Sequence, residues 1–241
     1  MISYLPSYLH RDARKNHLLV FSGLVNLMSK YPISHNGNKK LGEFFEEILS
    51  FHIPPSRDKI LLDPTCGKKH LWENYMIRDS SGKSKLDEYG KVVFSDIKAY
   101  GQEIVSDIRD LNFDYQFDGI IYDPPYFFGY RGSDDPRRQD YGDYVQSYRE
   151  LLDFMDIANN KFPNWLKENG KLIVKCADQY QTREGKFYPH HYTWINRLTN
   201  FEVVDLFIFV HHRISPTAFQ VKNRGSSVIM HTYFLIFEKK V

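Results

Sequence analysis

Cysteine is scarce in this sequence, which has only Cys66 and Cys176 among its 241 residues. The two lie far apart and lack metal-ligand partners at zinc spacing, so neither a disulfide framework nor a structural zinc site is expected. No metal site of another kind is predicted. A chain without disulfides is typical of a reducing compartment, and we therefore expect an intracellular, cytoplasmic protein.

Long apolar runs are also missing. No run of 18 or more apolar residues occurs and nothing resembles a secretion signal, so neither a membrane span nor a membrane partner is predicted. The absence of a Gly-x-Gly-x-x-Gly fingerprint disfavours a nicotinamide dehydrogenase. The formal net charge is only +2, so the composition alone does not indicate a nucleic-acid-binding protein.

The stretch that carries the most chemical information is residues 118–130, DGIIYDPPYFFGY. Residues 119–122 predict a short buried strand, which ends at Pro124 and Pro125 because proline donates no hydrogen bond to a β-ladder and fixes φ. Asp123 therefore lies at the carboxyl end of a strand, where open α/β sheets bind their ligands. A plain strand-ending turn is the alternative interpretation, but the aromatic residues that follow are unusual for a solvated turn.

Asp123-Pro124-Pro125-Tyr126 resembles the DPPY motif of the S-adenosylmethionine-dependent amino-methyltransferases, which methylate the exocyclic nitrogen of a base in nucleic acids. The resemblance implies that these four residues are catalytic. An exocyclic amine is a poor nucleophile because its lone pair is delocalised into the ring. The Asp123 carboxylate and the Pro124 carbonyl would accept its hydrogens and release that lone pair, and Tyr126 would stack on a base turned out of its helix.

Three further segments resemble cofactor-binding elements of the same family. Residues 63–67, Asp-Pro-Thr-Cys-Gly, follow the first predicted strand and end in a glycine that lets the backbone approach a ligand. An acidic residue at the end of the next strand binds ribose hydroxyls in Rossmann-like sites, and a third acidic residue would bind the adenine amino group beside an apolar neighbour. The residues implied to bind S-adenosylmethionine are Asp63, Pro64, Thr65, Gly67, Asp96, Ile97, Asp107 and Ile108.

One position departs from the family pattern: Lys69 stands where a second glycine is usual. The departure leaves open how closely this loop wraps the cofactor, and it makes the lysine a candidate for binding the methionine carboxylate. It also gives support to a different class of function, a non-catalytic nucleic-acid-binding module that kept the same fold.

The resemblance implies an α/β fold, with a Rossmann-like class I methyltransferase sheet of about seven strands. We expect this methyltransferase domain over residues 59–241, after an N-terminal helical extension over residues 1–58 in which apolar residues have helical spacing at 18–27 and 41–49. The predicted strands cover residues 59–62, 91–94, 104–106, 119–122, 171–176, 201–210 and 229–237. The predicted helices of the domain cover residues 71–77, 144–157, 162–167 and 188–198.

Substrate recognition is expected to come from loops or from a partner, since little of the chain remains for a large separate recognition domain. Residues 127–141 are too rich in glycine, proline and charge for regular structure and predict a lid, and residues 211–227 are basic. The predicted nucleic-acid contacts are Phe127, Phe128, Tyr130, Arg131, Arg137 and Arg138. DNA is the first predicted partner, with adenine N6 or cytosine N4 as the target, and guanine N2 of transfer or ribosomal RNA is the alternative. The oligomeric state is left open.

Overall fold

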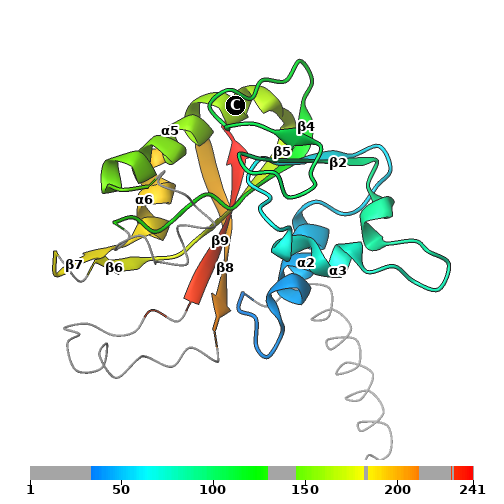
Figure 1. Ribbon diagram of the computed structural model, residues 1–241, viewed down its shortest axis with the longest axis horizontal. Helices are drawn as coiled ribbons and strands as arrows, with labels where there is room; N and C mark the ends of the chain where they lie inside the picture. The colour runs from blue at the N-terminus through cyan, green and yellow to red at the C-terminus, as the bar shows by residue number, and fades with distance from the viewer. Residues whose placement is uncertain (1–33, 130–144, 182–183, 212–228, 230, 241) are drawn as a thin grey trace, which may run out of the picture. The chain divides into compact units, whose positions relative to one another are not determined.

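A seven-stranded sheet forms the centre of the protein in a computed structural model that describes residues 34–129, 145–181, 184–211, 229 and 231–240. The strand order is β3-β2-β1-β4-β5-β9-β8 (Figure 1). Strands β1 to β5 are parallel, and β9 and β8 complete the sheet as an antiparallel pair. The strands are β1 Ile60–Asp63, β2 Lys91–Asp96, β3 Ile104–Val105, β4 Phe117–Tyr122, β5 Leu166–Cys176, β8 Phe201–Val210 and β9 His231–Lys239. This is the Rossmann-like class I methyltransferase fold, and the predicted fold class is confirmed.

Helices cover both faces of the sheet. On one face lie α5 Tyr148–Trp165 and α6 His190–Arg197; on the other lie α2 Leu41–His52, the 3-10 turn η1 His70–Trp72 and α3 Glu73–Met76 (Figure 1). A second 3-10 turn, η2 Lys85–Glu88, precedes β2. The chain thus forms three layers, helix on sheet on helix.

The strand sequences explain this layering. Successive side chains of a strand point to opposite faces, and in β4 Ile120 packs in the α5 and α6 layer while Ile121 packs in the α2 layer. Strand β5 alternates in the same way at Leu172 and Ile173. Both faces are covered, so these strands read as continuous apolar runs rather than as alternating ones.

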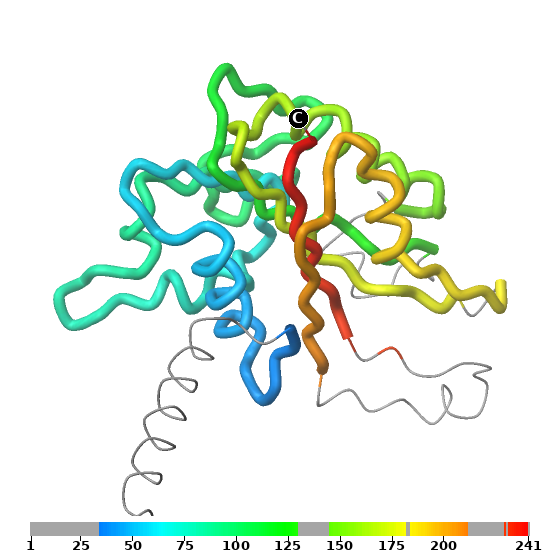
Figure 2. Tube along the Cα trace, turned by 180° about the vertical axis from the view of Figure 1, so that it is seen from behind, coloured from blue at the N-terminus to red at the C-terminus, as the bar shows by residue number. Residues whose placement is uncertain are grey.

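The C-terminal strands match their prediction closely. Strand β8 has the predicted bounds, and β9 begins two residues later than predicted. Figure 2 shows the two strands side by side along their length, as the orange and red tubes. Their apolar side chains Phe207 and Phe234 contact Phe44 of α2 edge to face, at centroid distances of 6.1 and 6.0 Å.

The two helices predicted over residues 144–157 and 162–167 are one helix, α5. Ser147 caps it by accepting a hydrogen bond from the Glu150 N–H, and Met155, Ala158 and Phe162 continue one buried stripe at helical spacing. The prediction of a break at 158–161 was wrong because this stripe crosses it. Helix α5 ends at Trp165, so the prediction of helix over 166–167 was also wrong, and β5 begins at Leu166 instead of residue 171.

Other element boundaries also differ from the prediction. The predicted helix over residues 71–77 is the short pair η1 and α3, and the helix predicted from residue 188 begins at His190. A small hairpin, β6 Gln179–Gln181 and β7 Lys186–Tyr188, precedes α6 and was not predicted. The helix predicted over residues 18–27 lies outside the described residues, so the domain boundary at residue 58 stays a prediction. Within the described residues, none of the helices is long and apolar enough to cross a membrane.

Candidate functional site

A pocket opens at the carboxyl ends of β1, β2 and β4, where the strand order reverses between β1 and β4. This switch point is the place at which doubly wound sheets bind ligands. All eight residues that the sequence assigned to the cofactor line this one pocket, together with Asp123 and Pro125. The structure therefore brings together four segments that are separated along the chain.

The loop after β1 is held from inside by Asp63. Its buried carboxylate accepts hydrogen bonds from the Trp72 indole N–H at 2.7 Å and from the Thr65 backbone N–H at 3.1 Å. Burial, together with the nearby carboxylates of Asp123 and Asp96, raises the pKa of Asp63 to about 7 against the opposing effect of these two hydrogen bonds. Asp63 therefore braces the loop and η1 from a position that is only 1% exposed.

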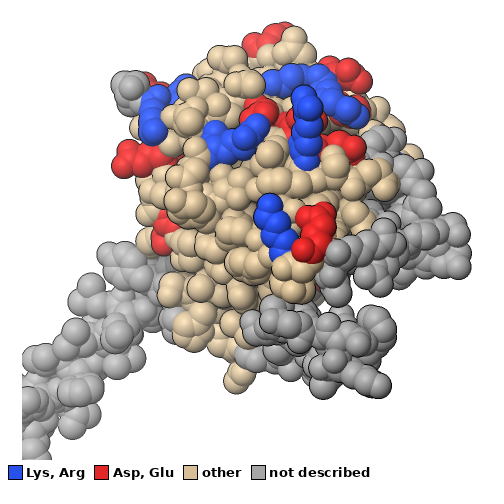
Figure 3. Space-filling view, turned by 90° about the vertical axis from the view of Figure 1, so that its left-hand side faces the viewer, with Lys and Arg blue, Asp and Glu red and all other residues tan. Residues whose placement is uncertain are grey.

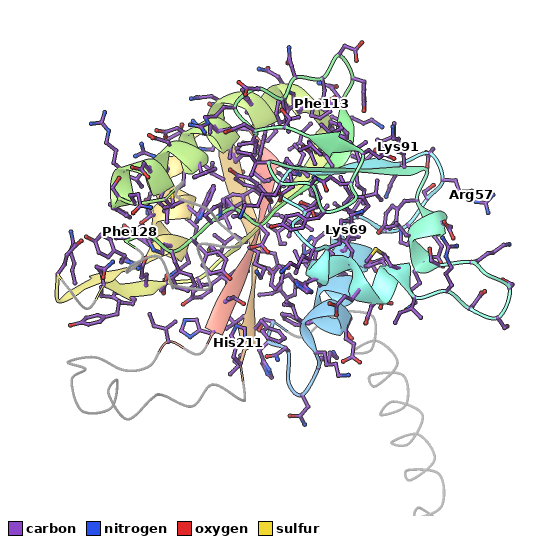
Figure 4. The ribbon with its side chains drawn as sticks, viewed as in Figure 1. Arg57, Lys69, Lys91, Phe113, Phe128 and His211 are labelled. Carbon is purple, nitrogen blue, oxygen red and sulfur yellow. The ribbon has the colours of Figure 1, made fainter. Side chains whose placement is uncertain are left out.

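Two residues with a left-handed backbone conformation shape the same loop. Gly67 has φ 49° and Lys69 has φ 61°, and Lys69 is the one residue other than glycine with positive φ in the described part of the chain. The backbone thus keeps at Lys69 the conformation that glycine favours. Lys69 (labelled in Figure 4) is not among the residues that line the pocket, and its ammonium lies 4.5 Å from the centroid of the Phe94 ring. This placement disagrees with the interpretation that Lys69 binds the methionine carboxylate, while its neighbour Lys68 does line the pocket.

Asp96 lies at the end of β2, facing the glycine loop. One carboxylate oxygen accepts a 2.9 Å hydrogen bond from the Gly67 N–H, and the other accepts a 3.0 Å bond from the Lys98 N–H. Ile97 beside it is an apolar side chain that is 38% exposed at the pocket wall. The carboxylate keeps further lone pairs for a ligand, because each of its oxygens accepts two hydrogen bonds.

Asp107 lies on the opposite wall of the pocket and is paired with Arg109. The Arg109 guanidinium donates to both of its carboxylate oxygens, and these hydrogen bonds lower the pKa of Asp107. The segment after it is tied to α5, since the Lys161 ammonium donates to the carbonyl oxygen of Leu111 at 3.0 Å. The wall that carries Asp107 and Ile108 is therefore fixed to the helix layer.

Asp123 follows β4, and two contacts hold it there. Its backbone N–H donates a 2.9 Å hydrogen bond to the Thr65 hydroxyl, and its carboxylate oxygens lie 2.9 and 2.8 Å from the Lys175 ammonium at the end of β5. Burial lowers the pKa of Lys175, but the Asp123 carboxylate and the Tyr126 hydroxyl outweigh it and leave this pKa raised. The pair is therefore ionised, with a fixed carboxylate at the pocket edge.

The aromatic residues after the two prolines divide into two groups. Tyr126 and Phe127 are partly exposed, with ring centroids 4.8 Å apart, and the Lys175 ammonium lies 5.1 Å from the centroid of the Tyr126 ring. Phe128 is only 4% exposed and packs on the rings of Tyr148 and Tyr188 (Figure 4). The prediction that Phe128 contacts nucleic acid was therefore wrong, because its ring is a buried anchor for the loop.

The other predicted nucleic-acid contacts, Tyr130, Arg131, Arg137 and Arg138, lie outside the described residues, as does most of the predicted lid. Figure 3 shows one face of the described part of the chain, where blue and red side chains are intermingled and no large blue area occurs. This face of the described residues therefore has no continuous positive surface of the kind that binds the phosphates of a nucleic acid.

Some site residues carried no signal in the sequence. Tyr100 and Phe154 line the pocket, but a tyrosine in a loop and a phenylalanine on an amphipathic helix are indistinguishable from packing residues. Lys175 is a further residue of the site, near the carboxyl end of β5. Its pairing with Asp123 depends on the β4–β5 register, in which Tyr122 lies opposite Val174.

The strand order, with the pocket at its switch point, defines the chain as having a class I methyltransferase fold. No family model matches the sequence, and no curated protein matches it.

Several solved structures of methyltransferases are similar in fold. The N-methyltransferase NodS from Bradyrhizobium japonicum has 14% identity over 83% of this chain and 96% of its own, with a TM-score of 0.49. TrmN from Thermus thermophilus has 10% identity over 83% of this chain and 49% of its own, with a TM-score of 0.47. An rRNA methylase from Streptococcus thermophilus has 12% identity over 84% of this chain and 98% of its own, with a TM-score of 0.41. At these values the fold assignment rests on the strand order.

Proposed function

We propose that this chain is an S-adenosylmethionine-dependent methyltransferase that acts on the exocyclic amino group of a base in DNA, adenine N6 or cytosine N4. The observation that carries the proposal is the ionised Asp123 carboxylate, held by Lys175 beside a pocket lined by every residue of the cofactor motifs. Guanine N2 of RNA stays the alternative, because it too has an exocyclic amine for Asp123 to bind.

The chemistry of the pocket wall fits the cofactor. Asp96 has free lone pairs for ribose hydroxyls, Asp107 offers a carboxylate to an adenine amino group, and the exposed Ile97 offers an apolar surface to the adenine ring. When bound, S-adenosylmethionine would supply an activated methyl group on its sulfonium. Lys68 and the backbone of the glycine loop line the part of the pocket next to β1.

Asp123 and Pro124 would hold the amine. Lys175 contacts both oxygens of the Asp123 carboxylate, but each oxygen keeps a second acceptor position. The carboxylate therefore accepts one amine hydrogen while the Pro124 carbonyl accepts the other, which draws the nitrogen towards tetrahedral geometry. The Lys175 ammonium donates to both Asp123 oxygens, so the carboxylate faces the amine as a hydrogen-bond acceptor.

The decisive experiment incubates the purified protein with labelled S-adenosylmethionine and either DNA or RNA, and then separates the nucleosides. We expect label in N6-methyladenine or N4-methylcytosine from DNA, and none with Asp123→Ala. Calorimetry should show that the variant still binds the cofactor, because Asp123 binds the amine. Label in N2-methylguanine from RNA would select the alternative, and no label in either polymer would contradict the proposal.

A further inference from the structure

A second cluster of titratable side chains lies at the same edge of the sheet, outside the residues that line the pocket. Asp178 follows β5, His191 is in the first turn of α6, and Tyr233 and His231 are near the start of β9. The function proposed above uses none of these four residues.

Asp178 and His191 form a closely bonded pair. His191 Nδ1 lies 2.7 and 3.0 Å from the two oxygens of the Asp178 carboxylate, which is 3% exposed. The Tyr233 hydroxyl donates to the same carboxylate at 3.3 Å, and the Tyr233 ring stacks on the imidazole with centroids 4.3 Å apart. His231 Nε2 lies 2.8 Å from the Tyr233 hydroxyl. The Asp178 carboxylate thus holds the Nδ1 edge of the imidazole, and the Tyr233 ring covers one of its faces.

These contacts determine which imidazole nitrogen is basic. A carboxylate accepts hydrogen bonds, so Nδ1 carries the proton and the lone pair of the neutral ring is on Nε2. Among the described residues, none is hydrogen-bonded to His191 Nε2, and the side chain is 28% exposed. An oriented, partly exposed Nε2 is the arrangement of a general base whose tautomer is held by an aspartate.

Asp178 and Asp123 follow the carboxyl ends of two adjacent strands, β5 and β4. On β5, Cys176 follows Lys175, which binds Asp123, and it lies opposite Tyr233 of β9 in the strand register. Burial raises the pKa of the Cys176 thiol, and the carboxylates of both Asp178 and Asp123 raise it further. Asp178, two residues beyond Cys176, and Asp123, paired with Lys175, thus share the carboxyl end of the β4–β5 pair.

We propose that His191 Nε2 accepts the proton that the target amine loses when it is methylated, an inference that rests on the proposed methyltransferase function. As the amine nitrogen bonds to the methyl carbon, the carbon–sulfur bond breaks and its electron pair stays on sulfur. The nitrogen then carries one proton too many. That proton passes to Nε2, which leaves a neutral methylamino group, and the imidazolium releases the proton to water.

A structural role alone is the competing explanation, since Asp178 also accepts a 3.3 Å hydrogen bond from the His191 backbone N–H in the first turn of α6. The titratable groups that face His191 are Asp178 beyond β5, Tyr233 on β9, with His231 behind it, and His190 in its own helix. The test must therefore separate loss of a base from loss of a helix contact.

The experiment measures single-turnover methylation of the nucleic acid that the parent accepts, between about pH 5 and pH 9. The parent rate should fall on the acid side, where protonated His191 accepts no proton. His191→Gln should be slower by about 100-fold and should lose that acid-side fall. His191→Ala should regain part of its rate with added imidazole, which a helix contact does not explain, and calorimetry should show parent cofactor affinity for both variants.

His52→Gln is the matched control, because His52 forms a similar pair with Asp205 at 3.2 Å, away from the pocket. It should keep the parent rate and pH profile. Thermal unfolding identifies a variant that fails to fold, and His191→Asn then takes its place. An acid-side fall that persists in His191→Gln, or no effect of imidazole on His191→Ala, would overturn the inference while parent activity still supports the proposed function. A parent that methylates neither polymer would overturn both.

Discussion

The backbone N–H of Asp123 donates a 2.9 Å hydrogen bond to the hydroxyl of Thr65, which joins the loop after β4 to the loop after β1. Thr65 belongs to the segment assigned to the cofactor, and Asp123 to the segment assigned to the amine. This hydroxyl therefore links the two halves of the candidate site beyond the ends of the paired strands β1 and β4.

Thr65→Val removes this hydroxyl and keeps the shape of the side chain. We expect the free energy of unfolding to fall by about 1 to 2 kcal/mol, because a partly buried N–H loses its acceptor. The methylation rate should fall about tenfold as Asp123 becomes less well placed. Thr65→Ser keeps the hydroxyl and is the control; equal rates for Val and Ser, measured by single turnover, would show that the bond does not position Asp123.

Lys175→Met removes the partner of the Asp123 carboxylate. We expect methylation to fall by about 100-fold while cofactor affinity stays within threefold of the parent, because the carboxylate loses the charge that holds it in place. The free energy of unfolding should fall by on the order of 2 kcal/mol, less than for a fully buried pair since Asp123 is a quarter exposed.

Lys167→Met is the control for that variant. Lys167 and Asp118 form another 2.8 Å pair between β5 and β4, at the opposite edge of the sheet. It should lower stability without a selective loss of methylation. Similar rates for the two lysine variants would contradict a role of Lys175 at the site.

Asp96→Asn tests the cofactor pocket. The amide has one oxygen, so the variant would lose one of the two hydrogen bonds that Asp96 accepts from Gly67 and Lys98. It would also lose hydrogen bonds to the ligand, each worth about 1.5 to 3 kcal/mol when the acceptor is charged. We expect about 10- to 100-fold weaker binding of S-adenosylmethionine by calorimetry and a near-parent rate at saturation. Asp110→Asn, an exposed change outside the pocket lining, is the control; an unchanged affinity in Asp96→Asn would shift the ribose role to another acid.

Tyr126 distinguishes a base-stacking enzyme from a packing tyrosine. Tyr126→Phe should keep most activity because the ring survives, although the 3.5 Å contact of its hydroxyl with Lys175 is lost. Tyr126→Ala should lose one to two orders of magnitude, since stacking contributes about 1 to 3 kcal/mol per base. Turnover is measured together with thermal unfolding: a stable, fully active Ala variant would exclude stacking, and an unstable one with parent activity per folded molecule would assign the ring to packing.

His190 predicts a pH dependence of stability. Its ring is fully buried, neither nitrogen has a hydrogen-bond partner among the described residues, and burial lowers its pKa to about 4. The unfolded chain binds a proton at this histidine near its ordinary pKa of about 6.5, so between about pH 6.5 and pH 4 only the unfolded state is protonated. The free energy of unfolding should therefore fall by on the order of 3 kcal/mol as the pH drops through this window.

His190→Phe removes that titration and suits the aromatic surroundings of Phe128, Tyr148 and Tyr188. Denaturant unfolding of parent and variant across the window should give curves that converge at neutral pH and separate in acid. Parallel curves would mean that His190 is protonated without cost in the folded state.

Local sequence was sufficient to predict features that depend on only a few neighbouring residues, such as the ends of strands. Apolar runs that stop at proline or glycine placed the ends of β1 and β4, and with them Asp63 and Asp123, because strand endings depend on residues that cannot continue a ladder. The prediction of a break within α5 was wrong because a buried stripe of Met155, Ala158 and Phe162 outweighs weak local preferences.

At the level of sequence, the resemblance of the motifs implied the class of fold, and local patterns placed the four strand-end segments that meet in the pocket, since strand endings depend on neighbours along the chain. The tertiary structure alone decided the partners. Lys175 reaches Asp123 through the β4–β5 register, Phe128 is buried against α5 and β7, and Asp178 meets His191 because α6 returns to the end of β5. These contacts join residues far apart in the chain, and which side chains meet there depends on how the layers pack, a property that no local pattern encodes.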